Sequence, residues 1–309
     1  MPLTGMRQQM PAATRGMVPA SLLESDIVKH PLRARHCLAK VLRSLRELAQ
    51  LKQRVIAERA QWSESKVIRI EAATVHISIT DVRAWLAVCG HNKSEDVEAI
   101  NALAHASRGR GWWGSYRTAV GAVLTDYYAL ESAAVALDEA SSIIPDLLQT
   151  EPYAAYVSAD FWADAERIAL DWRILRRRQA LLQTGVPMTF YLDAHAVSHV
   201  GGFEPAVHIV QCRHLLRVLA EYPHVTVRIV PGGADRFALA YGPFRRVTII
   251  DEPYDAVVYH GDPTGRVRPE RTDTGLAAVS ARLGRLDRVS LSRDDSIDVI
   301  AKSVASTHI

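Results

Sequence analysis

The stretch that decides the fold of the N-terminal part runs from Gln53 to Glu71 and reads QRVIAERAQWSESKVIRIE. Its apolar residues recur at helical spacing on both sides of Trp62, which predicts two short helices that meet at a tight turn. In the first helix, the small side chain of Ala57 suits the point where two helix backbones approach most closely. Ser63 suits the start of the second helix, because its hydroxyl can accept a hydrogen bond from a free backbone N–H.

The second helix has one apolar face and one polar face. Val67 and Ile70 lie three residues apart and share the inward face. A short helix with polar and basic residues outside has the shape and chemistry to enter a DNA major groove. The residues expected to probe base edges are Ser63, Ser65, Lys66 and Arg69. Glu64 beside them could accept a hydrogen bond from a cytosine amine or simply repel phosphate.

Residues at the start of the first helix are expected to hold the DNA backbone. Gln53 and the helix N-terminus can grip phosphate and set the register, as can Lys52 and Arg54 on either side. Between Arg33 and Glu71 there are ten Lys or Arg and four Glu, a local charge of +6, whereas the whole chain carries only +3. Positive charge is therefore concentrated where a phosphate backbone would be met. The bland alternative is a set of ordinary packing helices.

The same residues resemble a known family. Leu42-Arg43-x-Leu45-Arg46-Glu47 and Ser63-x-Ser65-Lys66-Val67-x-Arg69-Ile70-Glu71 look like the helix-turn-helix of Cro-repressor-type regulators, the xenobiotic-response-element (XRE) family. The resemblance covers about residues 33–108 and implies an ion pair between Arg46 and Glu71. The sequence departs from the family at Gln61 and Ala73, where Gly is usual. A left-handed turn conformation costs a non-Gly residue about 1 kcal/mol there.

The N-terminal region divides at composition changes. Residues 1–30 lack periodicity and are expected to form a mobile arm, followed by an all-α, five-helix domain at 31–108. Its fourth helix opens at the capping box Ser78-x-x-Asp81, and Ser94 caps the fifth. The joint between domains is expected at residues 108–111. One recognition helix reads too few base pairs alone, so we expect a homodimer on an inverted-repeat operator in double-stranded DNA.

Residues 109–309 resemble a second family. Trp112-Trp113, Leu130-Glu131 and the run Pro145-x-Leu147-Leu148-Gln149-Thr150-Glu151 are similar to the large domain of unknown function that follows the helix-turn-helix in many actinobacterial regulators. Asp146 replaces a glycine of that pattern, and the resemblance extends loosely through Gly201-Gly202 to the C-terminus. It implies a regulatory or interaction domain that senses a small partner protein encoded nearby, or a ligand. The aromatic residues of this half permit either.

The pattern of this half predicts an α+β domain with a small, mostly antiparallel sheet. Strands are expected at 188–192, 225–230, 246–250 and 256–260. Helices are expected at 163–182, 205–222, 274–286 and 294–303.

Catalytic, metal and cofactor sites are not expected. His195 and His199 lie four apart but in a strand-to-loop segment without a His-Glu-x-x-His motif. Asp193, Asp251, Glu252 and Asp255 near strand ends are explained equally well as surface acids. Three scattered cysteines, no apolar run of membrane length and no signal peptide favour a cytoplasmic, nucleoid-associated protein.

Three functions therefore remain open. The first is a sequence-specific DNA-binding transcriptional regulator, either repressor or activator. The second is an antitoxin-like interaction scaffold whose helix-turn-helix no longer reads DNA, with Gln61 and Ala73 as its signature. The third, a hydrolase or metal enzyme in the C-terminal half, predicts a metal that is lost on changing His195 or His199. We favour the first.

Overall fold

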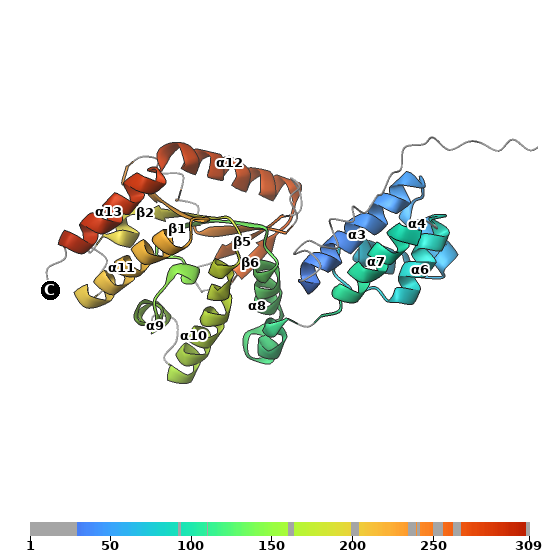
Figure 1. The fold of residues 1–309 in the computed structure, drawn as a ribbon, viewed down its shortest axis with the longest axis horizontal. Coiled ribbons are helices and arrows are strands. Elements are labelled where there is room, and N and C mark those ends of the chain that lie inside the picture. The colour runs from blue at the N-terminus through green and yellow to red at the C-terminus, as the bar shows by residue number, and fades with distance from the viewer. Residues whose placement is uncertain are drawn as a thin grey trace, which may run out of the picture. The chain divides into compact units, whose positions relative to one another are not determined.

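The computed structural model describes residues 30–91, 94–109, 111–159, 164–198, 204–233, 239, 242–249, 256–261 and 267–306. The expected N-terminal arm, residues 1–30, lies outside them except for His30. The chain forms two compact units, and the boundary between them in the sequence falls between Gly111 and Trp112 (Figure 1). No helix in these ranges is long and apolar enough to cross a membrane.

The first unit is helical. Its elements are α3 (Pro31–Leu48), α4 (Gln53–Ala60), α5 (Glu64–Glu71), α6 (Ile79–Val88) and α7 (Ser94–Ala106). One apolar core joins all five helices, with Leu42, Ile56, Val67, Trp85 and Ile100 fully buried at its centre. The indole Nε1 of Trp85 donates to the carbonyl of Leu42 at 3.0 Å, so α6 is fixed to α3 by a polar contact inside an apolar core.

The turns around α4 and α5 use the local chemistry of the sequence. Gln61 ends α4 in the left-handed conformation, with φ 56°, and its N–H bonds back to the last turn. Ser63 caps α5 by accepting the N–H of Lys66 at 3.2 Å. Ala73, after α5, also has a positive φ, of 55°. The turn between α4 and α5 is thus built without glycine and its strain is carried by Gln61, whereas Ala73 adopts the strained conformation in the turn after α5.

The second unit contains a six-stranded sheet of order β3-β2-β1-β4-β5-β6. Its strands are β1 (Ala136–Ser141), β2 (Met188–Asp193), β3 (Val225–Val230), β4 (Phe244–Thr248), β5 (Ala256–Gly261) and β6 (Val267–Glu270). β1, β2 and β3 pair in parallel, whereas β4, β5 and β6 join antiparallel.

The expected small, mostly antiparallel sheet is therefore wrong, and the sheet is mixed. Neither β1 nor β6 was predicted, and the missed β1 matters here because it pairs in parallel with β2. The β1 sequence ALDEAS has no β-branched or aromatic residue, so it gives little strand signal. It nevertheless lies in the centre of the sheet. Parallel neighbours require helical crossovers, and these are present between β1 and β2 and between β2 and β3.

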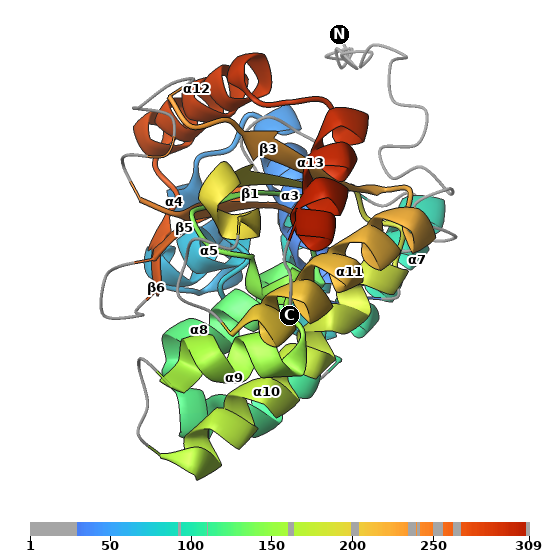
Figure 2. The same ribbon diagram turned by 90° about the vertical axis from the view of Figure 1, so that its left-hand side faces the viewer.

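Helices cover both faces of this sheet (Figure 1). On one side lies α12 (Asp273–Val289), and on the other lie α8 (Arg117–Ser132), α9 (Glu151–Ala159), α10 (Ala165–Gln179) and α11 (Pro205–Glu221). Figure 2 shows α13 (Arg293–Ser306) beside α11, where Ser303 Oγ lies 3.0 Å from Nε2 of His208. Short 3-10 helices occupy Trp112–Tyr116, Asp146–Leu148, Ala180–Gln183 and Ala194–Val197.

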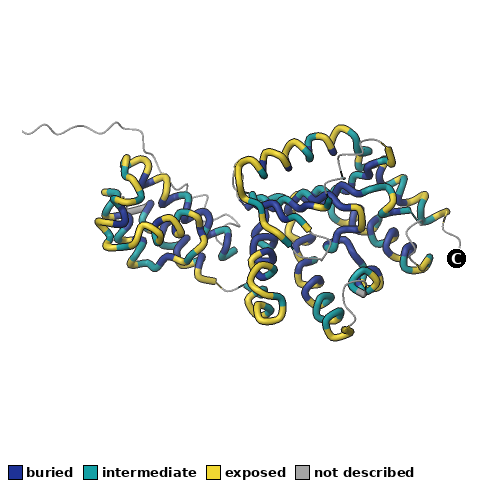
Figure 3. The backbone as a smooth tube through the Cα atoms, turned by 180° about the vertical axis from the view of Figure 1, so that it is seen from behind, coloured by how far each residue is buried: buried dark blue, intermediate teal, exposed yellow. Residues whose placement is uncertain are grey.

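Alternate residues of each strand face opposite helical layers. Ala140, Tyr191, Phe244 and Val258 form a core with Leu276, Val279, Leu283 and Leu286 of α12. Figure 3 shows the strands mostly buried and the outer side of α12 exposed. The intervening strand residues, which include Glu139, Arg245 and Tyr259, face the layer of α8 and α10.

Candidate nucleic-acid interface

The exposed face of α5 is formed by residues at helical spacing. Val67 and Ile70 are buried, with 0% and 2% exposure, and anchor the helix to the core. Ser65, Ile68, Arg69 and Ala72 are exposed and lie at positions i, i+3, i+4 and i+7. These four residues are called the α5 face below. It offers a hydroxyl, an apolar side chain and a guanidinium, whose Nε donates to the carbonyl of Ser65 at 3.2 Å.

Lys66 lies apart from the α5 face. Its Nζ is 3.1 Å from Oδ2 of Asp81 in the first turn of α6, and it lies over the ring of Trp62 at 4.1 Å from the centroid. Both side chains of the ion pair are partly buried. These two interactions hold the ammonium group of Lys66 beside Trp62 and the start of α6. The structure brings Ser65 and Arg69 together and leaves Lys66 in a bridging position between α5 and α6.

Arg46, Glu71 and Gln53 form a buried polar cluster. Nε and Nη2 of Arg46 donate to the two carboxylate oxygens of Glu71 at 2.5 and 3.1 Å. The side-chain amide of Gln53 donates to Oε2 of Glu71 at 2.7 Å. Hydrogen bonding to Glu71 raises the pKa of Arg46 above its usual value. The end of α5 is therefore clamped to α3 and to the start of α4.

The other residues expected to meet DNA surround the start of α4 and of α5. Lys52 is exposed and is the N-cap residue of α4, where no side chain caps the helix. Arg54 is exposed and pairs with Glu58 at 2.7 Å, one turn further along α4. Ser63 and Glu64 are exposed at the start of α5. Gln53 is the exception, because its side-chain amide donates to Glu71 in the polar cluster.

Ile68 was missed in the reasoning from sequence. It is 48% exposed although its neighbours Val67 and Ile70 are buried. Its spacing from Ser65 and Arg69 placed it on the polar side of α5, and that was the available signal. An isoleucine side chain in a DNA groove can pack against a thymine methyl group.

The residues considered for metal or acid–base chemistry do not assemble into a site in the described part of the chain. His195 is exposed and its Nδ1 lies 2.8 Å from Oδ1 of Asp193. His208 is buried and contacts Ser303 and Cys212. No group of three potential metal ligands occurs among these residues. His199, Asp251, Glu252 and Asp255 lie outside the described ranges.

Comparison with known protein families gives two matches. A family model described as a helix-turn-helix domain matches residues 38–99, which include α4 and α5. A model described as a domain of unknown function, DUF5753, matches residues 124–302, more than half of the chain. Searches of curated proteins and of solved structures find no match to the chain.

Proposed function

The chain belongs to the DUF5753 family and carries a helix-turn-helix domain typical of DNA-binding regulators, and from this premise we propose that it is a sequence-specific transcriptional regulator of the XRE type. The observation that carries the proposal is the α5 face: a hydroxyl, an aliphatic group and a guanidinium project together from a helix fixed at both ends. A helix that contacts bases must be rigid before it binds, because ordering flexible side chains on binding would reduce the affinity for DNA.

Each residue of the α5 face has a distinct proposed role. Arg69 donates to the acceptor edge of guanine, Ser65 bonds to a base edge or phosphate, and Ile68 contacts a thymine methyl. Lys66, held by Asp81 and Trp62, positions α5 and contributes charge near the backbone. Ser63 and Glu64 flank the face at the start of the helix.

The phosphate backbone is met at the start of α4. Lys52, the backbone N–H of Gln53 and Arg54 contact phosphates and set the register of α5 in the groove. Two copies of the chain bind an inverted repeat, with half-sites about one helical turn apart. The second unit adjusts this binding in response to a small partner protein or a ligand.

The experiment is operator selection from a random duplex library, followed by fluorescence anisotropy at two salt concentrations. Arg69→Ala should weaken operator binding by roughly 5- to 150-fold, the cost of one good base contact, and relax specificity at one position. Lys66→Ala should weaken binding to all sequences similarly. Arg83→Ala, an exposed arginine of α6, is the matched control and should have little effect.

Two outcomes would contradict the proposal. Binding equal for every sequence, and steep in salt, would leave only a basic patch. Partner binding without specific DNA affinity would instead favour an antitoxin-like interaction scaffold.

A further inference from the structure

A cleft of about 1090 Å³ opens between the described residues of the second unit, on the sheet face covered by α8, α9 and α10. Its lining includes Ser141 at the end of β1, Phe244 at the start of β4 and Gly261 at the end of β5. The cleft therefore lies at the C-terminal end of β1, where the parallel half of the sheet adjoins the antiparallel half. Open α/β sheets bind ligands in such a crevice.

The floor of the cleft is a row of three residues set by strand register. Glu139 of β1 pairs with Arg245 of β4, and Arg245 pairs with Tyr259 of β5. Because side chains alternate along a strand, all three project to the cleft side. Nε of Arg245 donates to Oε2 of Glu139 at 2.7 Å.

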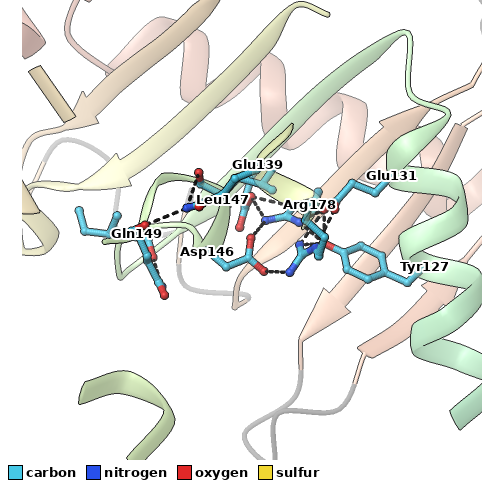
Figure 4. A network of polar contacts seen from close by, with 10 residues as sticks. Tyr127, Glu131, Glu139, Asp146, Leu147, Gln149 and Arg178 are labelled. Atoms are coloured by element: carbon cyan, nitrogen blue, oxygen red, sulfur yellow. Dashed lines mark hydrogen bonds and ion pairs between the residues drawn. The ribbon is translucent and has the colours of Figure 1, made fainter. Parts of the chain in front are cut away.

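A second arginine joins this row to the helices (Figure 4). Arg178 of α10 donates from Nε and Nη2 to the two carboxylate oxygens of Glu131, each at 2.7 Å, and from Nη1 to Asp146 at 2.6 Å. Arg245 also contacts Glu131, Tyr127 and Asp146. Asp146 therefore bridges both guanidiniums. The backbone around it is held by Gln149, whose amide donates to the carbonyl of Ile144 at 2.7 Å.

The network holds three carboxyl groups but only two guanidinium groups. Its carboxylates are Glu131, Glu139 and Asp146, and its cations are Arg178 and Arg245. Arg167, further along the lining, does not correct the difference because it pairs with Asp171 at 3.1 Å. Burial, reinforced by repulsion from Asp146 and Glu131, raises the pKa of Glu139 well above its usual value. A bound cation would offset this repulsion and stabilise the ionised form of Glu139.

The free hydrogen-bonding capacity of the network also favours a cation. Every nitrogen of the two guanidiniums already donates to a carboxylate or to Tyr127, so little remains for an anion. The carboxylates retain acceptor capacity: both contacts of Arg245 with Glu139 fall on Oε2, and no contact of Oε1 is found within the described ranges. Asp146 is the most exposed member, at 36% of its side chain.

Aromatic side chains line the cleft beside these carboxylates. Tyr127, Tyr128, Trp172 and Tyr259 all contribute to its lining. Tyr127 and Tyr259 meet edge to face with centroids 4.7 Å apart. Aromatic faces next to carboxylates bind organic cations through both apolar contact and cation–π attraction.

We propose that this cleft binds a small organic cation with an aromatic or apolar body. Its ammonium group lies against Asp146 and Glu139, and its body lies along Trp172. The regulatory consequence of this binding rests on the proposed sensing role of the second unit. The binding of the cation itself requires no DNA.

The test uses three probes that share one ring and differ in charge: tryptamine, tryptophol and indole-3-acetate. Calorimetry on the full chain without DNA should show one tryptamine site, with tryptophol at least about tenfold weaker because it lacks a charge-assisted hydrogen bond, and indole-3-acetate weaker still. Trp172→Ala should weaken tryptamine and tryptophol by similar factors. No binding of tryptamine at millimolar concentration, or equal binding of all three probes, would overturn the inference.

A matched pair of variants locates the site. Asp146→Asn removes the most exposed carboxylate of the network and should weaken tryptamine binding by at least about tenfold, whereas Glu166→Gln, exposed on the same lining, should leave it within about twofold. Equal effects of the two variants would refute the assignment. Tryptamine binding that leaves operator affinity unchanged would support the cleft and count against sensing. Intact operator binding without tryptamine binding would count against the cleft alone.

Discussion

The buried ion pair between Arg46 and Glu71 gives the sharpest stability prediction. The side chains are 11% and 5% exposed, and replacing Arg46 by Met leaves the Glu71 carboxylate buried with only the 2.7 Å bond from Gln53. An uncompensated buried charge costs about 3–5 kcal/mol. A helical unit that spans residues 31–106 has a total stability of about 4–11 kcal/mol, so this loss is a large part of it.

The expected change is measurable as a melting temperature. In a domain of this size, 1 kcal/mol corresponds to about 4–8 °C, so Arg46→Met should lower the melting temperature of the first unit by at least about 12 °C. The double variant Arg46→Met/Glu71→Met should recover much of the loss, because no charge remains buried. Differential scanning calorimetry gives the transition, and hydrogen-exchange mass spectrometry assigns it to the first unit.

The control lies on the same helix. Arg43 pairs with Glu47 at 2.9 Å but is 61% exposed, and such pairs contribute at most about 0.5 kcal/mol. Arg43→Met should therefore shift the transition by no more than about 4 °C. The reasoning is refuted if Arg46→Met shifts the transition no further than Arg43→Met, or if the double variant is less stable than Arg46→Met.

Three further variants test other features of the first unit. Gln61→Gly should stabilise it by about 0.5–1 kcal/mol in chemical denaturation, because glycine tolerates the positive φ of 56°; a destabilised variant would show that the Gln61 side chain matters more than the strain. Burial, aided by Arg33, lowers the pKa of His30 to about 4, so stability should fall as the pH drops from about 6.5 towards 4, when the unfolded chain takes up a proton first. His30→Phe should flatten that slope in pH-dependent melting curves, and an unchanged slope would contradict it. Trp85→Phe should cost about 1–3 kcal/mol, since it leaves the buried carbonyl of Leu42 without the indole donor; a loss below about 0.5 kcal/mol in urea denaturation would argue against this bond.

Local patterns were sufficient for the helix-turn-helix. The apolar positions Val67 and Ile70 lie three residues apart, and Ser63 is a cap that acts within one turn of chain. These short-range signals depend on helical geometry alone, so they can be recognised in the sequence without knowing the rest of the structure. The left-handed conformation of Gln61 could also be predicted from the sequence, because Gln61 occupies a position where the family that the sequence resembles usually has glycine.

The sheet topology of the second unit could not be predicted from local sequence patterns. β1 has the sequence ALDEAS and would not be chosen as a central strand, yet its position between β2 and β4 makes the sheet mixed. Parallel pairing joins residues about fifty positions apart, such as Leu137 and Met188, and no local propensity encodes that register. The prediction of a mostly antiparallel sheet failed for this reason.

The sequence by itself determined the pattern that turns Val67 and Ile70 inward and leaves Arg69 outside, because periodicity is a property of consecutive residues. Only the tertiary structure decided that Lys66 pairs with Asp81, that Ile68 shares the α5 face, and that Glu131, Arg178 and Arg245 meet in one network. Charged side chains far apart in the chain find partners only once packing has fixed the backbones that carry them. Burial then strengthens the interaction of each pair and makes an unmatched charge costly.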